Sequence, residues 1–91
     1  MALGIYFGEA NFTTKTYKEA LKKLEDAGVG NPDGRTYHVA FGDPENLQIF
    51  DVWESQEKFD KFGEKLMPIL ASVGYEPPTP MIAPVHNIIK G

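Results

Sequence analysis

The chain has 91 residues, of which 42% are hydrophobic and 24% charged, and this composition is typical of one globular domain spanning residues 1–91. Its net charge is −4 and its nine basic residues are scattered, so we expect no nucleic-acid partner. It has no cysteine, which excludes disulfides and thiolate ligands. Because neither a leader peptide nor a long apolar run is visible, we expect a cytoplasmic protein without a membrane contact.

The first strand is predicted over Leu3–Phe7. Tyr6 shares one face of it with glycines, where the missing side chains leave room for a ligand that the phenol could contact. The following loop, residues 8–13, could then lie over a pocket.

A helix is predicted from Thr14, as its N-cap, to about Ala27. Apolar residues recur at helical spacing along it, and they are Tyr17, Ala20, Leu21 and Leu24. Gly28 is a typical terminator, and the segment 31–34 (Asn-Pro-Asp-Gly) indicates a turn. We therefore expect Tyr17 to be a core residue.

A hairpin is predicted next, with one strand over Arg35–Phe41, a turn over residues 42–45 and a second strand over Asn46–Glu54. The second strand is apolar on both faces, with Leu47, Ile49 and Trp53 on one and Phe50 and Val52 on the other. It is therefore expected at the centre of the sheet, covered on both sides. Tyr37, on the first strand, is expected in the core.

The last third of the chain predicts a helix capped by Ser55 and ended by Gly74. Pro68 lies inside it and lacks the N–H that helical bonding uses, so we expect a kink or a break there. A proline-rich extended connector over residues 76–80 follows. The final strand is predicted over Val85–Lys90, and it carries His86 and Asn87.

The predicted order βαββαβ indicates an α+β, ferredoxin-like antiparallel sheet with both helices on one face. The other face would then be a large apolar surface on a monomer. A homodimer that packs sheet against sheet removes this exposure, and we therefore expect a second copy of the chain as partner.

Three segments resemble the dimeric α/β-barrel superfamily, which includes the small antibiotic-biosynthesis-type monooxygenases. These segments are residues 37–40 (Tyr-His-Val-Ala), 51–59 (Asp-Val-Trp-Glu-Ser-Gln-Glu-Lys-Phe) and 84–89 (Pro-Val-His-Asn-Ile-Ile). The resemblance implies the dimeric barrel fold and a Trp at the substrate site, here Trp53. Haem-degrading members also use an Asn on the first strand and a His on the second helix. This chain has neither, so the resemblance does not extend to haem breakdown.

Candidate catalytic residues are the two histidines, His38 and His86, and Asp51 on the central strand. The histidines are expected on the two edge strands, so they could share a pocket only across a dimer; the alternative is that each is a hydrogen-bonded structural histidine. Asp51, among apolar neighbours, is either a general base or the ion-pair partner of Arg35 or His38. Candidate ligand-binding residues are Tyr6, Trp53 and Asn87.

Three classes of function stay open on these residues. One is an enzyme acting on a small apolar or aromatic metabolite, as a cofactor-independent monooxygenase or an isomerase. The others are a ligand-binding dimer without chemistry and a structural or regulatory dimer. We expect no cofactor and no metal, because no phosphate-binding glycine loop and no ligand spacing for a metal is visible. Whether the protein is an enzyme is not decided at this level.

Overall fold

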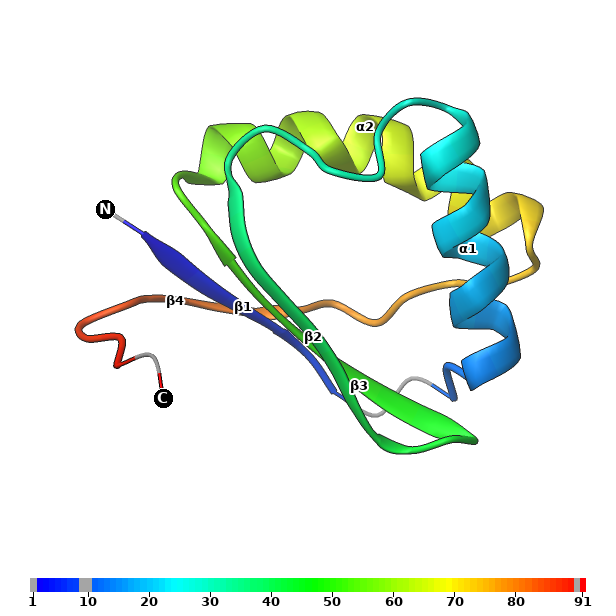
Figure 1. Cartoon of the computed structure of the whole chain (residues 1–91), viewed down its shortest axis with the longest axis horizontal. Coiled ribbons are helices and arrows are strands. Elements are labelled where there is room, and N and C mark those ends of the chain that lie inside the picture. The colour runs from blue at the N-terminus through cyan, green and yellow to red at the C-terminus, as the bar shows by residue number, and fades with distance from the viewer. Residues whose placement is uncertain (1, 9–10, 90) are drawn as a thin grey trace.

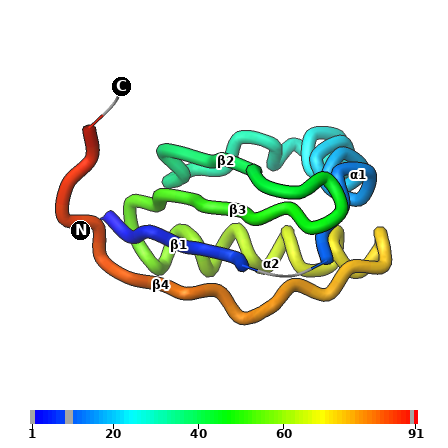
Figure 2. The backbone as a smooth tube through the Cα atoms, turned by 90° about the horizontal axis from the view of Figure 1, so that it is seen from below, coloured from blue at the N-terminus to red at the C-terminus, as the bar shows by residue number. Residues whose placement is uncertain are grey.

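The structure is a computed structural model that describes residues 2–8, 11–89 and 91. Its four strands form one antiparallel sheet in the order β2-β3-β1-β4, and the elements are β1 (Leu3–Phe7), α1 (Thr14–Asp26), β2 (Arg35–Asp43), β3 (Asn46–Trp53), α2 (Gln56–Ser72) and β4 (Met81–Pro84). Both helices lie on one side of the sheet (Figure 1), and the strand order is seen from below in Figure 2. The predicted α+β, ferredoxin-like fold is confirmed.

The predicted central strand is confirmed in β3, which pairs with β1 on one side and β2 on the other. Its residues alternate as expected: Leu47, Ile49, Asp51 and Trp53 are all buried on the helix side. Phe50 lies on the outer face, where its ring covers the space beside Gly4. One strand thus supplies both the core and, through Asp51, a buried carboxylate.

A β-bulge interrupts the pairing of β2 with β3 close to Thr36. Arg35 lies opposite Trp53, whereas Tyr37 lies opposite Val52. The chain therefore advances two residues on β2 but only one residue on β3. Residues directly opposite in an antiparallel pair point to the same face. The bulge therefore turns Arg35 to the helix side, although simple alternation would place it on the outer face with Tyr37.

Both helices begin at a side-chain cap. The cap of α1 is Thr13, whose Oγ1 accepts from the Thr16 N–H at 3.2 Å, so the expectation of Thr14 was wrong by one residue. Thr14 instead belongs to the first turn, where its N–H donates to the Pro44 carbonyl. Ser55 caps α2 as predicted, accepting from the Lys58 N–H at 3.3 Å.

Pro68 does not divide the second helix, because α2 is continuous through it. The expected break is therefore absent. Pro68 and Glu64, whose carbonyl loses its helical donor, are both exposed. Water can bond that carbonyl, so the helix tolerates the proline.

The prediction of the last strand was wrong. β4 is Met81–Pro84 rather than Val85–Lys90, and residue 90 lies outside the described residues. Leu3 pairs with Pro84, and only one further bond, from the Val85 N–H to the Ala2 carbonyl, extends this edge. The chain beyond Val85 leaves the sheet (Figure 2).

The core lies between the sheet and the helices, and its fully buried side chains are Trp53 and Ile5. The outer face of the sheet is different: Tyr37 is 54% exposed, Phe41 44% and Met81 64%. The prediction of Tyr37 as a core residue was therefore wrong for the single chain. An apolar sheet face without a covering layer remains, as the sequence predicted.

Candidate functional site

A cavity of about 440 Å³ lies between the helices and the sheet. This volume is in the range of small-molecule sites. Most of its described lining is apolar, contributed by β1, β3, both helices and the proline-rich connector, and includes Phe7, Phe12, Leu24, Ile49, Phe59, Phe62, Leu66 and Leu70. Four of its polar residues, Tyr17, Arg35, His38 and Asp51, gather in one place, and three others, Asp60, Tyr75 and Thr79, also line the cavity. The arrangement suits a largely apolar ligand with one polar end.

Four side chains form a hydrogen-bonded chain at this polar end. The Tyr17 hydroxyl lies 2.7 Å from His38 Nε2, and His38 Nδ1 lies 2.5 Å from Asp51 Oδ1. The indole N–H of Trp53 donates to Asp51 Oδ2 at 3.3 Å. Asp51 is only 5% exposed, and both its oxygens have partners. Of the two expected partners of Asp51, Arg35 and His38, it is His38 that bonds the carboxylate.

This chain of bonds fixes the orientation of His38. An ionised carboxylate only accepts hydrogen bonds, so the hydrogen of a neutral His38 lies on Nδ1, where it donates to Asp51. Nε2 then carries a lone pair and accepts from the Tyr17 hydroxyl. The ring of Tyr17 also stacks on the imidazole, with centroids 6.0 Å apart and planes inclined by 12°. Asp51 and Tyr17 thus hold both ring nitrogens of His38 at the edge of the cavity.

Tyr17 keeps its proton in this setting. Burial raises the pKa of its phenol; nearby Arg35 opposes the shift, and nearby Asp51 adds to it. The phenol therefore stays a donor to His38 at neutral pH. The same causes show that the Arg35 charge acts on the polar end of the cavity.

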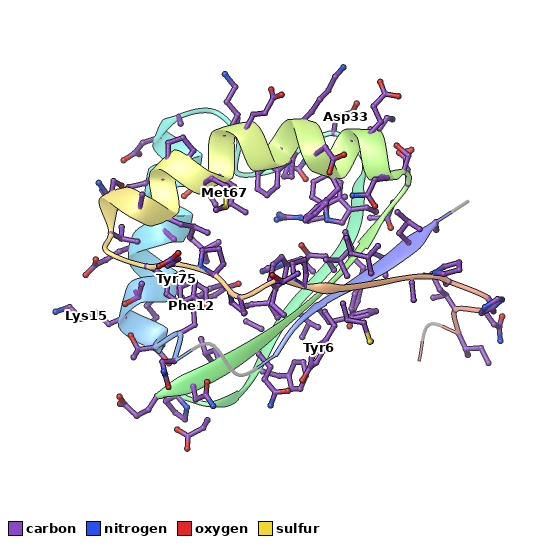
Figure 3. All side chains as sticks on the ribbon, turned by 180° about the vertical axis from the view of Figure 1, so that it is seen from behind. Tyr6, Phe12, Lys15, Asp33, Met67 and Tyr75 are labelled. Carbon is purple, nitrogen blue, oxygen red and sulfur yellow. The ribbon has the colours of Figure 1, made fainter. Side chains whose placement is uncertain are left out.

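An aromatic pair closes another part of the lining. Phe12, just before α1, stacks on Tyr75, just after α2, with centroids 4.2 Å apart and planes inclined by 19°. Figure 3 shows the two rings side by side where the connector passes the helices. Burial raises the pKa of Tyr75. The prediction of a loop over a pocket is met at Phe12, whereas residues 9–10 of that loop lie outside the described residues.

The structure brings three of the predicted site residues together and separates the others. His38, Asp51 and Trp53 form one hydrogen-bonded group, although Trp53 is fully buried and lies behind the cavity lining, against Asp51, Phe59 and Phe62. Tyr6 lies on the outer face of the sheet, where its hydroxyl donates to Gln48 (Figure 3). The room beside Gly4 on that face is taken by the Phe50 ring.

His86 and Asn87 lie beyond β4 rather than on a strand, and both are exposed. They do not reach the cavity of their own chain. Sequence reasoning missed Tyr17, which fits an apolar helical stripe and was assigned to the core. A tyrosine is the amphipathic member of that stripe, and this was the only available signal.

Neither a protein-family model nor a curated protein matches the sequence. Solved structures do match the fold. A protein of Chloroflexus aurantiacus, provisionally described as an antibiotic biosynthesis monooxygenase, superposes with a TM-score of 0.63 at 18% identity over 100% of both chains. SnoaB of Streptomyces nogalater, described as a cofactor-independent oxygenase, gives 0.65 at 7% identity over 99% of this chain and 97% of its own.

A third such structure, from Nitrosomonas europaea, is also provisionally described as an antibiotic biosynthesis monooxygenase. It superposes with a TM-score of 0.63 at 14% identity, over 93% of this chain and 98% of its own. The chain has the antibiotic-biosynthesis-monooxygenase-like fold. The resemblance seen in the sequence is therefore confirmed for the fold.

Neither helix in residues 2–8, 11–89 and 91 combines the length and the apolar run needed to cross a membrane. The same residues contain no group of three or more His, Cys, Asp or Glu side chains placed to hold a metal ion.

Proposed function

We propose that this protein is a cofactor-independent monooxygenase of a small aromatic metabolite, with His38 as its general base. The observation that carries this proposal is the bond from His38 to buried Asp51, which leaves Nε2 as a base beside an apolar cavity. Removing an acidic hydrogen from an aromatic substrate gives an electron-rich anion that can reduce O₂ itself. SnoaB, which shares the fold, is described as an oxygenase of this kind, and this similarity supports the proposal.

The proposed reaction balances without an added reductant. A substrate methylene loses its two hydrogens and gains one oxygen atom from O₂ as a carbonyl, while the other oxygen atom leaves as water. All the electrons come from the substrate. His38 accepts the first proton, Asp51 holds the imidazole in place, and Trp53 orients Asp51. The Tyr17 hydroxyl, which bonds Nε2 in the structure, gives way to the substrate.

The test is oxygen consumption with anthrone, whose acidic methylene becomes the second carbonyl of anthraquinone. Wild type should accelerate the reaction over buffer, and His38→Gln should lower the rate by about 10²- to 10⁴-fold, the usual contribution of a general base. Asp60→Asn is the matched control, because Asp60 lines the same cavity but bonds only to Gln56 among the described residues. A wild type that binds anthrone without oxidising it would instead support a non-catalytic binding protein.

We further propose that the outer face of the sheet packs against the same face of a second copy. Support comes from the exposure of Tyr37, Phe41 and Met81 on this face, which a dimer would bury. Val39→Glu places a charge between Tyr37 and Phe41 and should give a monomer in analytical ultracentrifugation. Lys22→Glu, on the exposed side of α1, should leave the dimer intact. Equal sedimentation of both variants would contradict this interface.

The predicted roles of His86 and Asn87 can apply only across such a dimer, because both lie outside the cavity of their own chain. If a partner supplies His86, then His86→Gln should slow anthrone oxidation without changing the fold. An unchanged rate would remove His86 from the site.

A further inference from the structure

Arg35 carries the permanent positive charge among the described residues that line the cavity. Its place there depends on the bulge near Thr36, without which the side chain would point to the outer face. Bulges often re-aim a side chain beside a functional site. The fold therefore brings a guanidinium to the same polar end as His38.

The Arg35 charge has no carboxylate partner within ion-pair distance among residues 2–8, 11–89 and 91. Two carboxylates line the same cavity: Asp51, whose two oxygens already bond His38 and Trp53, and Asp60, which accepts from Gln56. One guanidinium nitrogen donates to the Gly30 carbonyl at 3.2 Å. A guanidinium has five N–H donors, so most of them stay available to a ligand.

We propose that the cavity takes an aromatic ligand with an anionic oxygen, a carboxylate or an ionised phenol or enol, and that Arg35 holds this oxygen. The inference builds on the cavity and the base of the proposed function and names the substrate class. Arg35 lies 5.9 Å above the Phe62 ring, so the ligand's charged group meets the guanidinium where the apolar wall begins. An arginine suits this task because its planar fork matches such oxygens.

The two roles of Arg35 as binder and His38 as base are complementary. Both side chains line the cavity near Tyr17: His38 bonds its hydroxyl, and the Arg35 charge partly opposes the rise that burial causes in the pKa of the phenol. When His38 removes a proton, the ligand gains negative charge at this end of the cavity. Arg35 stabilises this charge, so it favours the anion over the neutral ligand.

The experiment compares 2-naphthoate with its uncharged relative 2-naphthylmethanol, by isothermal titration of the wild-type protein. The naphthoate should bind roughly 10- to 100-fold more tightly, as expected for one charge-assisted contact. Arg35→Gln should remove this preference while leaving the affinity for 2-naphthylmethanol within about twofold. Arg35→Lys should retain part of the preference, because it keeps the charge but not the fork.

Three results would overturn the proposal: wild type that binds both probes equally, wild type that does not bind 2-naphthoate, or Arg35→Gln that keeps the preference. Arg35→Gln could fail to fold after losing its bond to Gly30, but the first two results need only the wild-type protein, so the proposal can still be refuted. The result is also independent of oxygenation. Arg35-dependent binding without any anthrone oxidation would refute the monooxygenase alone, whereas oxidation without a preference for the anion would refute only the role of Arg35.

Discussion

Replacing Asp51 by Asn should move the hydrogen of His38 from Nδ1 to Nε2 and so destroy the base. Asp51 accepts from His38 at 2.5 Å and from Trp53 at 3.3 Å, but an amide offers one oxygen and one NH₂ group. The indole N–H can only donate, so the Asn oxygen must turn to Trp53. The NH₂ group then faces Nδ1 of His38, which must give up its hydrogen to accept.

The size of this preference follows from the cost of turning the Asn amide the other way. If the NH₂ group faced Trp53, two donors would meet in a site where the indole is fully buried. Such an unsatisfied donor costs about 1–3 kcal/mol, which favours the Nε2–H form of His38 by roughly 5- to 150-fold. The exchange of two charge-assisted bonds for neutral ones should also lower stability by about 1–3 kcal/mol. For a domain of this size each kcal/mol lowers Tm by roughly 4–8 °C.

The assay is a long-range ¹H–¹⁵N correlation spectrum of the histidine rings. The chain has only two histidines, and exposed His86 serves as an internal reference. Wild-type His38 should show hydrogen on Nδ1, and Asp51→Asn should show it on Nε2. Asp60→Asn makes the same charge change in the same cavity and should leave His38 unaltered. Hydrogen on Nδ1 in Asp51→Asn, or on Nε2 in wild type, would refute the bonding scheme.

Three further predictions concern stability, with unfolding followed by the fluorescence of the single tryptophan or by circular dichroism. Trp53→Phe removes the donor to Asp51 and should cost about 1–3 kcal/mol in urea unfolding; a loss below this range would show that the indole bond contributes little. Gly34→Ala should destabilise the protein, because φ at Gly34 is +96° and the new methyl group would lie 2.7 Å from the Cβ of Lys58. Gly63→Ala, inside α2 with open space around it, should instead raise the stability by up to about 1 kcal/mol. The reverse order of stabilities would contradict this reasoning. The pKa of Tyr75 is raised by burial, so its contribution to stability is present below the ordinary value of about 10 and is lost as pH rises through the folded-state value. Tyr75→Phe should therefore weaken the alkaline loss of Tm, and an unchanged pH profile would speak against it.

The sequence predicted the features that depend on neighbours along the chain. Alternation in residues 46–53 placed Leu47, Ile49 and Trp53 on one face, which is the core face of the structure, and Ser55 was identified as a cap. The turn chemistry and helical spacing also gave the correct order of strands and helices. Each of these is set by periodicity or by a hydrogen bond within a few residues, which a sequence displays directly.

Only the tertiary structure decided the partners. Tyr17 and His38 meet from a helix and a strand, and the choice of His38 over Arg35 as the partner of Asp51 depends on the pairing register of β2 with β3. The bulge that turns Arg35 inward shifts that register by one residue, which reverses the face of a side chain. The last strand was also misplaced, because β4 is bounded by the length of β1 rather than by its own composition. Local propensity fixes which segments form the sheet and helices, whereas long-range pairing fixes which side chains meet at the site.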